Sequence, residues 1–325
     1  MFIKLFRTES FLQLFLLLTV GILLWLPAFI HPVASPSAWS PVPLYEKTIH
    51  VVGTATYTNT ILAFLLIITH GILFTLLLSA HDLSPRNNVL PAIIYMIFMS
   101  WNPTMLTLHP GLITNTVLLV FLYLFLKIYE KPDAFKEVFS ACFTLSIACF
   151  FDAPVVVLLL LVWLGFIIYR VFTWREWVIS LIGFGLPLLY MAFYYFWTDH
   201  LSSVATRIIT LKNQLHLIDY HLDPVTLIIQ LIFGLLIFAA ILRVYGIIQE
   251  KVISIRKKFI FIIWFFILTI PIFLLSGNSR WFQGSISLLP ATALVTFHFT
   301  SLKKLFWWEI LFTTLILGLI WIRIF

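Results

Sequence analysis

The sequence predicts an all-α protein that folds as a polytopic bundle of transmembrane helices. The chain has 325 residues, of which 62% are hydrophobic and only 10% are charged. Soluble domains carry about 25% charged residues. Apolar runs of about 20 residues, the length that crosses the hydrocarbon core, recur along the whole chain. The fold class follows from these two observations and from the alternating charge of the connecting segments.

The apolar runs divide the chain into about eleven spans. The first run is too long for the apolar region of a signal peptide, so we expect it to remain as an uncleaved first span. No soluble domain interrupts the series, and residues 1–325 are expected to form a single integral membrane domain. The runs lie near residues 11–30, 60–80, 89–108, 111–127, 135–151, 153–172, 176–198, 225–248, 259–276, 285–301 and 307–325.

The basic residues predict the orientation of this bundle. With the N-terminus inside, fifteen of the 20 Lys and Arg residues fall in cytoplasmic segments and five fall in external segments. Cytoplasmic loops of membrane proteins carry such an excess. The net charge of +7 is therefore explained by topology and does not indicate binding to nucleic acid. Eleven spans would place the C-terminus outside.

Two longer segments are expected on the external face. The first external loop, residues 31–59, begins with four prolines in its first thirteen residues, which prevent the preceding helix from continuing. Residues 199–224 are predicted to form an external amphipathic helix that lies in the outer interface. Its apolar residues recur at spacings of three and four: Val204, Ile208, Leu211, Leu215, Ile218 and Leu222.

Two external carboxylates are the candidate catalytic residues. Glu46 is the only acid in the first external loop, and it is either a general base or a solvated carboxylate beside Lys47. Asp152 precedes Ala153 and Pro154 in the turn between the fifth and sixth spans. It is either a helix cap or an ionisable group on a substrate path, since such groups at the membrane boundary often mark one.

Arg280 is the candidate ligand for a substrate phosphate, and Arg207 is expected to assist it. Arginine presents a planar fork of donors that fits a phosphate group. The alternatives are an aromatic-belt anchor for Arg280 and simple lipid headgroup contacts for Arg207. His216, Asp219 and His221 do not have the spacing of a metal site, so no cofactor is expected, although a divalent metal is compatible with the sequence. His70 is interpreted as a packing residue, and His109 is given no role.

The layout resembles that of the GT-C glycosyltransferases. The shared features are an uncleaved first span, an acid in a long first external loop, many spans with short connections, and a late external segment of arginine and aromatic residues. Residues 150–199 are also similar to the core of an uncharacterised family of bacterial inner-membrane proteins. The similarity there rests on the turn Trp174-Arg175-Glu176-Trp177 and on a following span with Gly183, Phe184 and Pro187. Residues 279–290 resemble the arginine-aromatic segment of both groups.

The resemblance implies an enzyme of the bacterial inner membrane that transfers a sugar from a polyprenyl-phosphate carrier to an acceptor on the outer face. Its expected partners are membrane lipids, the lipid-linked sugar and other membrane proteins, with no nucleic acid. The rival hypothesis is a non-catalytic membrane subunit or scaffold of an envelope-assembly or secretion complex. Transport is disfavoured because charges in the middle of the spans are almost absent.

Overall fold

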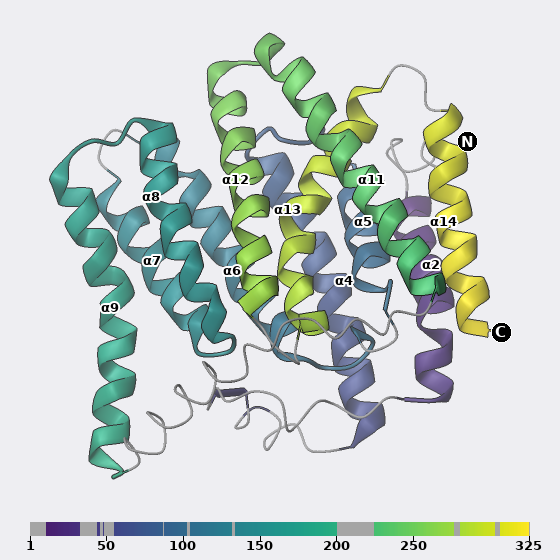
Figure 1. The fold of residues 1–325 in the computed structure, drawn as a ribbon, viewed down its shortest axis with the longest axis horizontal. Coiled ribbons are helices and arrows are strands. Elements are labelled where there is room, and N and C mark those ends of the chain that lie inside the picture. Colours follow the sequence, from purple (N-terminus) through teal and green to yellow (C-terminus); the bar gives the residue numbers. More distant parts are fainter. Residues whose placement is uncertain are drawn as a thin grey trace.

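The computed structural model is all-helical, which confirms the predicted fold class (Figure 1). It describes residues 11–32, 44–45, 48, 55–86, 88–102, 105–131, 134–199, 224–275, 280–302 and 306–324. Eleven α-helices lie within these residues, and each overlaps one of the eleven predicted apolar segments. They are α2 (Phe11–Ile30), α4 (Thr56–Ala80), α5 (Leu90–Met99), α6 (Pro110–Leu126), α7 (Phe135–Cys149), α8 (Leu158–Tyr169), α9 (Trp174–Trp197), α11 (Pro224–Ile247), α12 (Ile253–Leu275), α13 (Arg280–Ser301) and α14 (Phe306–Ile324).

The number of spans is smaller than the sequence predicted. Within the described residues, four helical stretches are long and apolar enough to cross a membrane. These stretches are Gln13–Ile30, Thr56–Ala80, Trp174–Trp197 and Ile228–Glu250. They are consistent with a multi-pass membrane protein, but the prediction of eleven spans is wrong. Several of the predicted spans are apolar in sequence and are nevertheless broken or short in the structure.

The predicted span 89–108 shows the physical reason most clearly. Its helix, α5, has 10 residues and is therefore about 15 Å long, half the thickness of the hydrocarbon core. The described residues between Ser100 and His109, namely 100–102 and 105–109, form no α-helix and are almost all buried. Irregular backbone at membrane depth is tolerated where protein surrounds it. Hydropathy alone does not distinguish such a segment from a continuous helix.

A second predicted span, 153–172, is also divided. It begins with a 3-10 helix, η3 (Ala153–Val157), and only its second part is the α-helix α8. Pro154 in the first turn has no backbone N–H to donate, which suits a helix start. Two further 3-10 turns, η2 (Ile128–Glu130) and η4 (Ile248–Glu250), follow α6 and α11.

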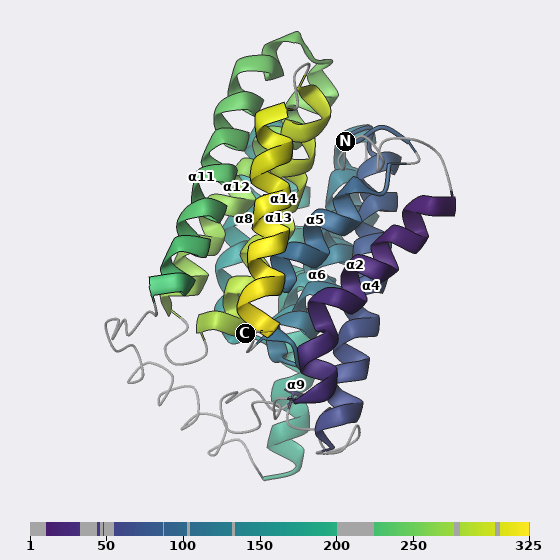
Figure 2. The same cartoon turned by 90° about the vertical axis from the view of Figure 1, so that its right-hand side faces the viewer.

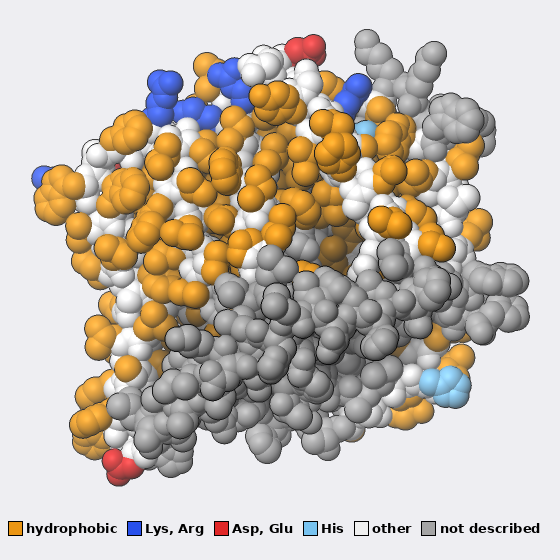
Figure 3. Space-filling model, in the orientation of Figure 1, with side chains coloured by type: hydrophobic (Ala, Val, Ile, Leu, Met, Phe, Trp, Pro, Cys, Tyr) orange, Lys and Arg blue, Asp and Glu red, His pale blue; other side chains and the backbone are white. Residues whose placement is uncertain are grey.

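The helices run up and down between two ends of the molecule (Figures 1 and 2). The described Lys and Arg side chains gather along one edge, which we call the basic end (Figure 3). Basic residues from separate parts of the chain lie close together at this end. Lys257 Nζ lies 5.0 Å from the centre of the Tyr129 ring, and Arg86 and Lys251 line one pocket. The end at which α7, α9 and α12 finish is called the opposite end (Figure 1). Among the described residues, the two ends thus differ in charge.

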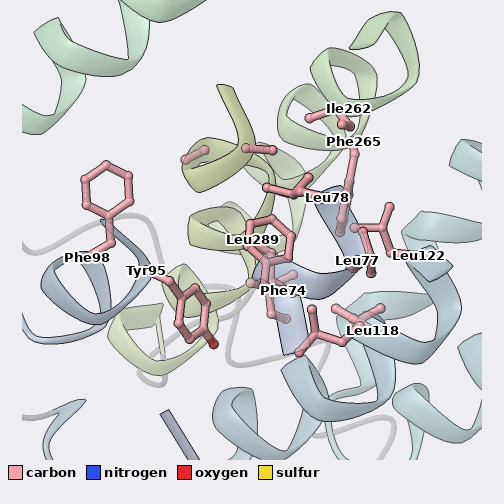
Figure 4. Packing of buried hydrophobic residues seen from close by; sticks show 14 of the residues in the cluster. Phe74, Leu77, Leu78, Tyr95, Phe98, Leu118, Leu122, Ile262, Phe265 and Leu289 are labelled. Atoms are coloured by element: carbon pink, nitrogen blue, oxygen red, sulfur yellow. The ribbon is translucent and has the colours of Figure 1, made fainter. Parts of the chain in front are cut away.

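The centre of the bundle is a continuous apolar core. Side chains from α4, α5, α6, α12 and α13 meet there, among them Phe74, Phe98, Leu122, Phe265 and Leu289 (Figure 4). The outward faces of the helices are also apolar and are exposed, which is the pattern of a surface solvated by lipid.

The predicted external amphipathic helix at 199–224 lies almost wholly outside the described residues, and so does most of the first external loop at 31–59. Helix α4 begins at Thr56, four residues before the predicted span. Helix α11 begins at Pro224, which matches the predicted start of that span.

Candidate functional site

A hydrogen-bonded polar centre lies inside the bundle between α4, α5, α6 and α13. We define it by His70, Tyr95, Asn115 and Thr116, of which His70, Tyr95 and Asn115 are fully buried. His70 Nδ1 lies 3.2 Å from Tyr95 Oη, and His70 Nε2 lies 2.8 Å from Thr116 Oγ1. Asn115 Nδ2 donates to Tyr95 Oη at 3.4 Å and to the Ser285 carbonyl oxygen of α13 at 3.1 Å. Four side chains and one backbone carbonyl thereby join four helices.

One assignment of protons satisfies all of these contacts. Tyr95 donates to His70 Nδ1 and accepts from Asn115. His70 then donates from Nε2 to Thr116, whose hydroxyl donates to the Leu112 carbonyl oxygen at 3.4 Å. The neutral imidazole offers one donor and one acceptor, which this pattern uses fully. Asn115 Oδ1 has no hydrogen-bond partner in the described part of the chain. The centre therefore retains one unused hydrogen-bond acceptor.

The side chain of His70 points into the bundle because His70 lies on the buried face of α4. Ala63, Ile67, His70 and Phe74 are buried at spacings of four, three and four, which is one face of a helix. Gly71 lies beside them, where a Cβ atom would approach the Cα of Ala92 on α5 to 3.1 Å. The missing side chain lets α4 and α5 come close enough for His70 to reach Tyr95.

His109 is the N-cap residue of α6, the helix that carries Asn115 and Thr116. Its Nδ1 atom accepts a hydrogen bond from the Leu112 N–H at 3.2 Å, which satisfies one of the free donors of the first turn. Burial, with a smaller contribution from the neighbouring His70, lowers the pKa of His109 to about 3. The ring is therefore neutral at physiological pH, as an accepting Nδ1 atom requires.

Two hydrogen bonds attach other parts of the chain to the irregular 100–109 segment. Tyr45 is fully buried and donates from Oη to the Leu108 carbonyl oxygen at 3.1 Å. Burial raises the pKa of Tyr45 above its ordinary value, so the phenol keeps its proton. At the start of the segment, Trp25 of α2 donates from Nε1 to Ser100 Oγ at 2.9 Å. The non-helical backbone is thus fixed at both of its ends by buried aromatic donors.

Asp152 is the one predicted site residue whose side chain the structure describes. It lies after α7 at the opposite end and is 2% exposed. It occupies the N-cap position of η3, but its side chain makes no capping hydrogen bond. Its backbone carbonyl accepts from the Val155 N–H at 3.1 Å. The cap interpretation therefore applies to its backbone and does not account for its buried carboxyl group.

The other predicted site residues are described only in part. Glu46 and Arg207 lie outside the described residues, and Arg280 is described only as the first backbone position of α13. Segment η3 contacts α12, and α12 packs against α13. Because α12 finishes at the opposite end and α13 begins there, the start of α13 lies at the same end of the bundle as Asp152. The meeting of all four residues in one site stays a prediction.

The polar centre is the feature that sequence reasoning missed. His70 was expected to be a satisfied packing histidine, and the partners of its two ring nitrogens agree with this expectation. The network that it joins was not predicted, and His109 was given no role. The available signal was the occurrence of Asn115 and Thr116 within an apolar run, about one turn into a predicted span. Polar side chains in such positions face the protein interior and often mark functional sites. Among the described residues, no group of three or more His, Cys, Asp or Glu residues could hold a metal ion.

The Trp174-Arg175-Glu176-Trp177 turn lies at the basic end and starts α9. Trp177 donates from Nε1 to the Val171 carbonyl oxygen at 3.3 Å, and its ring stacks on Trp163 at 6.3 Å between centroids. These contacts fix the connection between α8 and α9, which is a structural role.

Comparison of the chain with the models of known protein families, with curated proteins and with solved structures found no match.

Proposed function

We propose that this protein is a membrane-embedded glycosyltransferase of the GT-C type. Its substrate would be a sugar carried by a polyprenyl phosphate, and its acceptor would bind at the opposite end of the bundle. The observation that carries the proposal is the buried carboxyl group of Asp152 at that end, 2% exposed and not used as a helix cap. An ionisable group costs free energy in such a position, and this cost is commonly accepted where the group takes part in chemistry.

The proposed topology follows from the charge of the two ends. Cytoplasmic segments of membrane proteins are rich in Lys and Arg. We therefore orient the basic end toward the cytoplasm of a bacterial inner membrane, with the N-terminus inside, and the opposite end toward the outer face. A carrier lipid would then enter the site sideways from the outer leaflet.

In the proposed reaction, the carboxylate of Asp152 or Glu46 takes the proton of the acceptor hydroxyl group. The acceptor oxygen bonds to the anomeric carbon of the sugar while the bond from that carbon to the phosphate oxygen breaks. Arg280, assisted by Arg207, would bind the departing polyprenyl phosphate. Tyr45, the residue before Glu46 in the sequence, donates a hydrogen bond to the Leu108 carbonyl oxygen.

The proposal is tested by mass spectrometry of envelope glycans and lipid-linked sugars in a deletion strain that carries plasmid copies of the gene. Asp152→Asn should lower sugar transfer by about 10²–10⁴-fold if the carboxylate is the general base, and the lipid-linked donor should accumulate. Asp199→Asn is the matched control, because Asp199 is also at the opposite end but is exposed at the end of α9. Asparagine tolerates its positive φ of 55°.

A second candidate function, a non-catalytic membrane subunit, is favoured by the shape of α9. Beyond Pro187 this helix has no buried residue, and Tyr190 and Trp197 are 69% and 78% exposed. Figure 1 shows its end extending past the neighbouring helices. A wild-type glycan profile in the deletion strain would contradict the transferase. Loss of a co-purified membrane protein in Trp197→Ser, but not in Leu160→Ser on α8, would then support the subunit.

A further inference from the structure

Two hollows meet at the basic end of the bundle, and Arg86 lines both of them. One is a polar pocket of about 330 Å³, and the other is an apolar groove of about 840 Å³. We infer that together they form a binding site for an acidic phospholipid, with the phosphate in the pocket and an acyl chain in the groove. This inference does not depend on the proposed transferase, which would act at the opposite end.

The polar pocket is lined by hydrogen-bond donors from two separate connections of the chain. Ser84 and Arg86 come from the connection between α4 and α5, and Lys251 comes from the connection between α11 and α12. Ser84 is 6% exposed, and its hydroxyl group has no hydrogen-bond partner in the described part of the chain. A buried hydroxyl without a partner costs free energy. Because that oxygen is itself enclosed, the Ser84 side chain must turn toward the pocket before a phosphate oxygen can accept from it.

The other hydroxyl groups of the pocket are already engaged. Thr300 Oγ1 donates to the Phe297 carbonyl oxygen at 3.0 Å, and Ser301 Oγ donates to the His298 carbonyl oxygen at 3.0 Å. The donors that remain for a ligand are therefore Ser84 and the two cations. A ligand that is rich in acceptors and carries negative charge fits this set best.

The charge of the pocket also favours an anion. Arg86 and Lys251 outnumber the single lining acid, Asp82. Arg243 adds a third cation beside the pocket, since its Nη2 donates to the Ser301 carbonyl oxygen at 3.3 Å. Buried Lys258 lies near the Asp82 side, with Nζ 3.5 Å from His81 Nδ1. Basic pockets between transmembrane helices on the cytoplasmic side commonly bind acidic lipid headgroups.

The groove continues from Arg86 along the sides of α4 and α6. Its walls are apolar, with Leu73, Leu76, Leu119 and Val120 among the lining residues. The hydroxyl groups on α4 within it are turned to their own helix: Thr75 donates to the Gly71 carbonyl oxygen at 2.9 Å, and Ser79 donates to that of Leu76 at 2.9 Å. The groove therefore offers few polar partners away from Arg86, which suits a hydrocarbon chain.

The length of the groove matches one leaflet of a membrane. Its lining residues on α4 run from Ile72 to Ala80, which corresponds to about 12 Å along the helix. One leaflet contributes about half of the 30 Å hydrocarbon core. A charged pocket at the end of an apolar groove of this length fits a phospholipid better than a free phosphate, which would leave the groove without an occupant.

Native mass spectrometry of the purified full-length protein in detergent tests this site. Dioleoyl phosphatidylglycerol should bind more tightly than dioleoyl phosphatidylcholine, and sn-glycerol 3-phosphate should not compete with it. Arg86→Ala should weaken binding of phosphatidylglycerol about tenfold, as expected for the loss of one charge-assisted hydrogen bond. Arg175→Ala is the control, because Arg175 is exposed at the basic end but does not line the pocket. Lys251→Ala, at an exposed position, tests the pocket independently should Arg86→Ala not fold.

The groove is tested by Val120→Trp, which places a large side chain in the acyl site. Val178→Trp on α9 is the control, since the two valines are 48% and 41% exposed and only Val120 lines the groove. Val120→Trp should weaken dioleoyl phosphatidylglycerol about tenfold and leave the short-chain dihexanoyl lipid unaffected. Equal binding of the acidic and neutral lipids, equal effects of Arg86→Ala and Arg175→Ala, or full competition by sn-glycerol 3-phosphate would overturn the inference.

Discussion

The α7–α9 pair and the polar centre join their helices in different ways. Helix α9 packs along α7 through one stripe of residues that includes Ser180, Gly183 and Pro187. At Gly183 an added Cβ atom would lie 2.8 Å from the Phe139 carbonyl oxygen, so the two backbones approach closely. In the polar centre, by contrast, His70, Asn115 and their partners connect α4, α5, α6 and α13 by hydrogen bonds.

The contrast follows from the solvent. Lipid tails are as apolar as leucine side chains, so burying apolar surface does little to bring two membrane helices together. Close contact at small residues and hydrogen bonds between helices are the two interactions that remain. The α7–α9 pair depends on the first and the polar centre on the second. Substitutions that disrupt the close backbone contact and substitutions that remove a hydrogen bond should therefore change stability independently of each other.

The largest expected effect is that of Gly183→Leu, which breaks the α7–α9 contact. The new side chain would overlap the backbone of α7, and we expect a loss of about 3 kcal/mol in the free energy of unfolding. Gly185→Leu on the same helix is the control, because a Cβ atom at Gly185 meets no atom within 4 Å. Unfolding in mixed micelles, followed by circular dichroism, measures both. Equal stabilities of the two variants would show that the close approach of the two backbones does not stabilise the packing of α9 against α7.

Much of the helical framework could be predicted from the sequence, because a long apolar run in lipid must form a helix to satisfy its backbone. The alternation of charge between the loops likewise predicted the basic end. The prediction missed the break after Met99 because it followed hydropathy, and Trp101, Met105 and Leu106 keep that stretch apolar. The pair Asn102-Pro103 was the local signal for a helix end. What stabilises it is tertiary, namely the hydrogen bonds from Trp25 and Tyr45.

The candidate site was less predictable than the fold. Asp152 could be identified because a carboxylate between two apolar runs is conspicuous in a sequence. The polar centre could not, because its members come from distant parts of the chain: His70 lies 46 residues from Thr116, and Asn115 lies 170 residues from Ser285. Asn115 and Thr116 are neighbours on α6, but His70, Tyr95 and Ser285 lie on three other helices. Only packing brings them together.

The next largest expected effect is the pH dependence of stability, which tests the buried polar region of the bundle. His109 has a pKa of about 3 in the folded protein, against about 6.5 when unfolded. Below pH 6.5 the unfolded chain binds a proton that the folded chain does not, so stability is lost as the pH falls toward 3. At pH 5 the loss from this group is about 2 kcal/mol.

His109→Asn isolates this contribution from that of the other histidines. Asparagine is a good N-cap and can accept the Leu112 N–H, but it does not titrate. Between pH 7.5 and pH 5 the variant should lose about 2 kcal/mol less stability than the wild type. The α7–α9 contact contains no such group, so Gly183→Leu should leave the pH dependence unchanged. Parallel pH profiles for His109→Asn and the wild type would contradict a neutral, buried His109.

The smallest expected effect is the coupling energy of one hydrogen bond in the polar centre. A double-mutant cycle of His70→Phe and Thr116→Val removes the 2.8 Å contact while nearly conserving volume. Hydrogen bonds between membrane helices contribute about 1 kcal/mol, and we expect a coupling energy of that size. The control cycle pairs His70→Phe with Thr75→Val, because the Thr75 hydroxyl donates to the Gly71 carbonyl oxygen of its own helix. Its coupling should be near zero. If both cycles give the same coupling, the His70–Thr116 contact contributes no specific stability, and α4 and α6 are held together, as α7 and α9 are, by close packing alone.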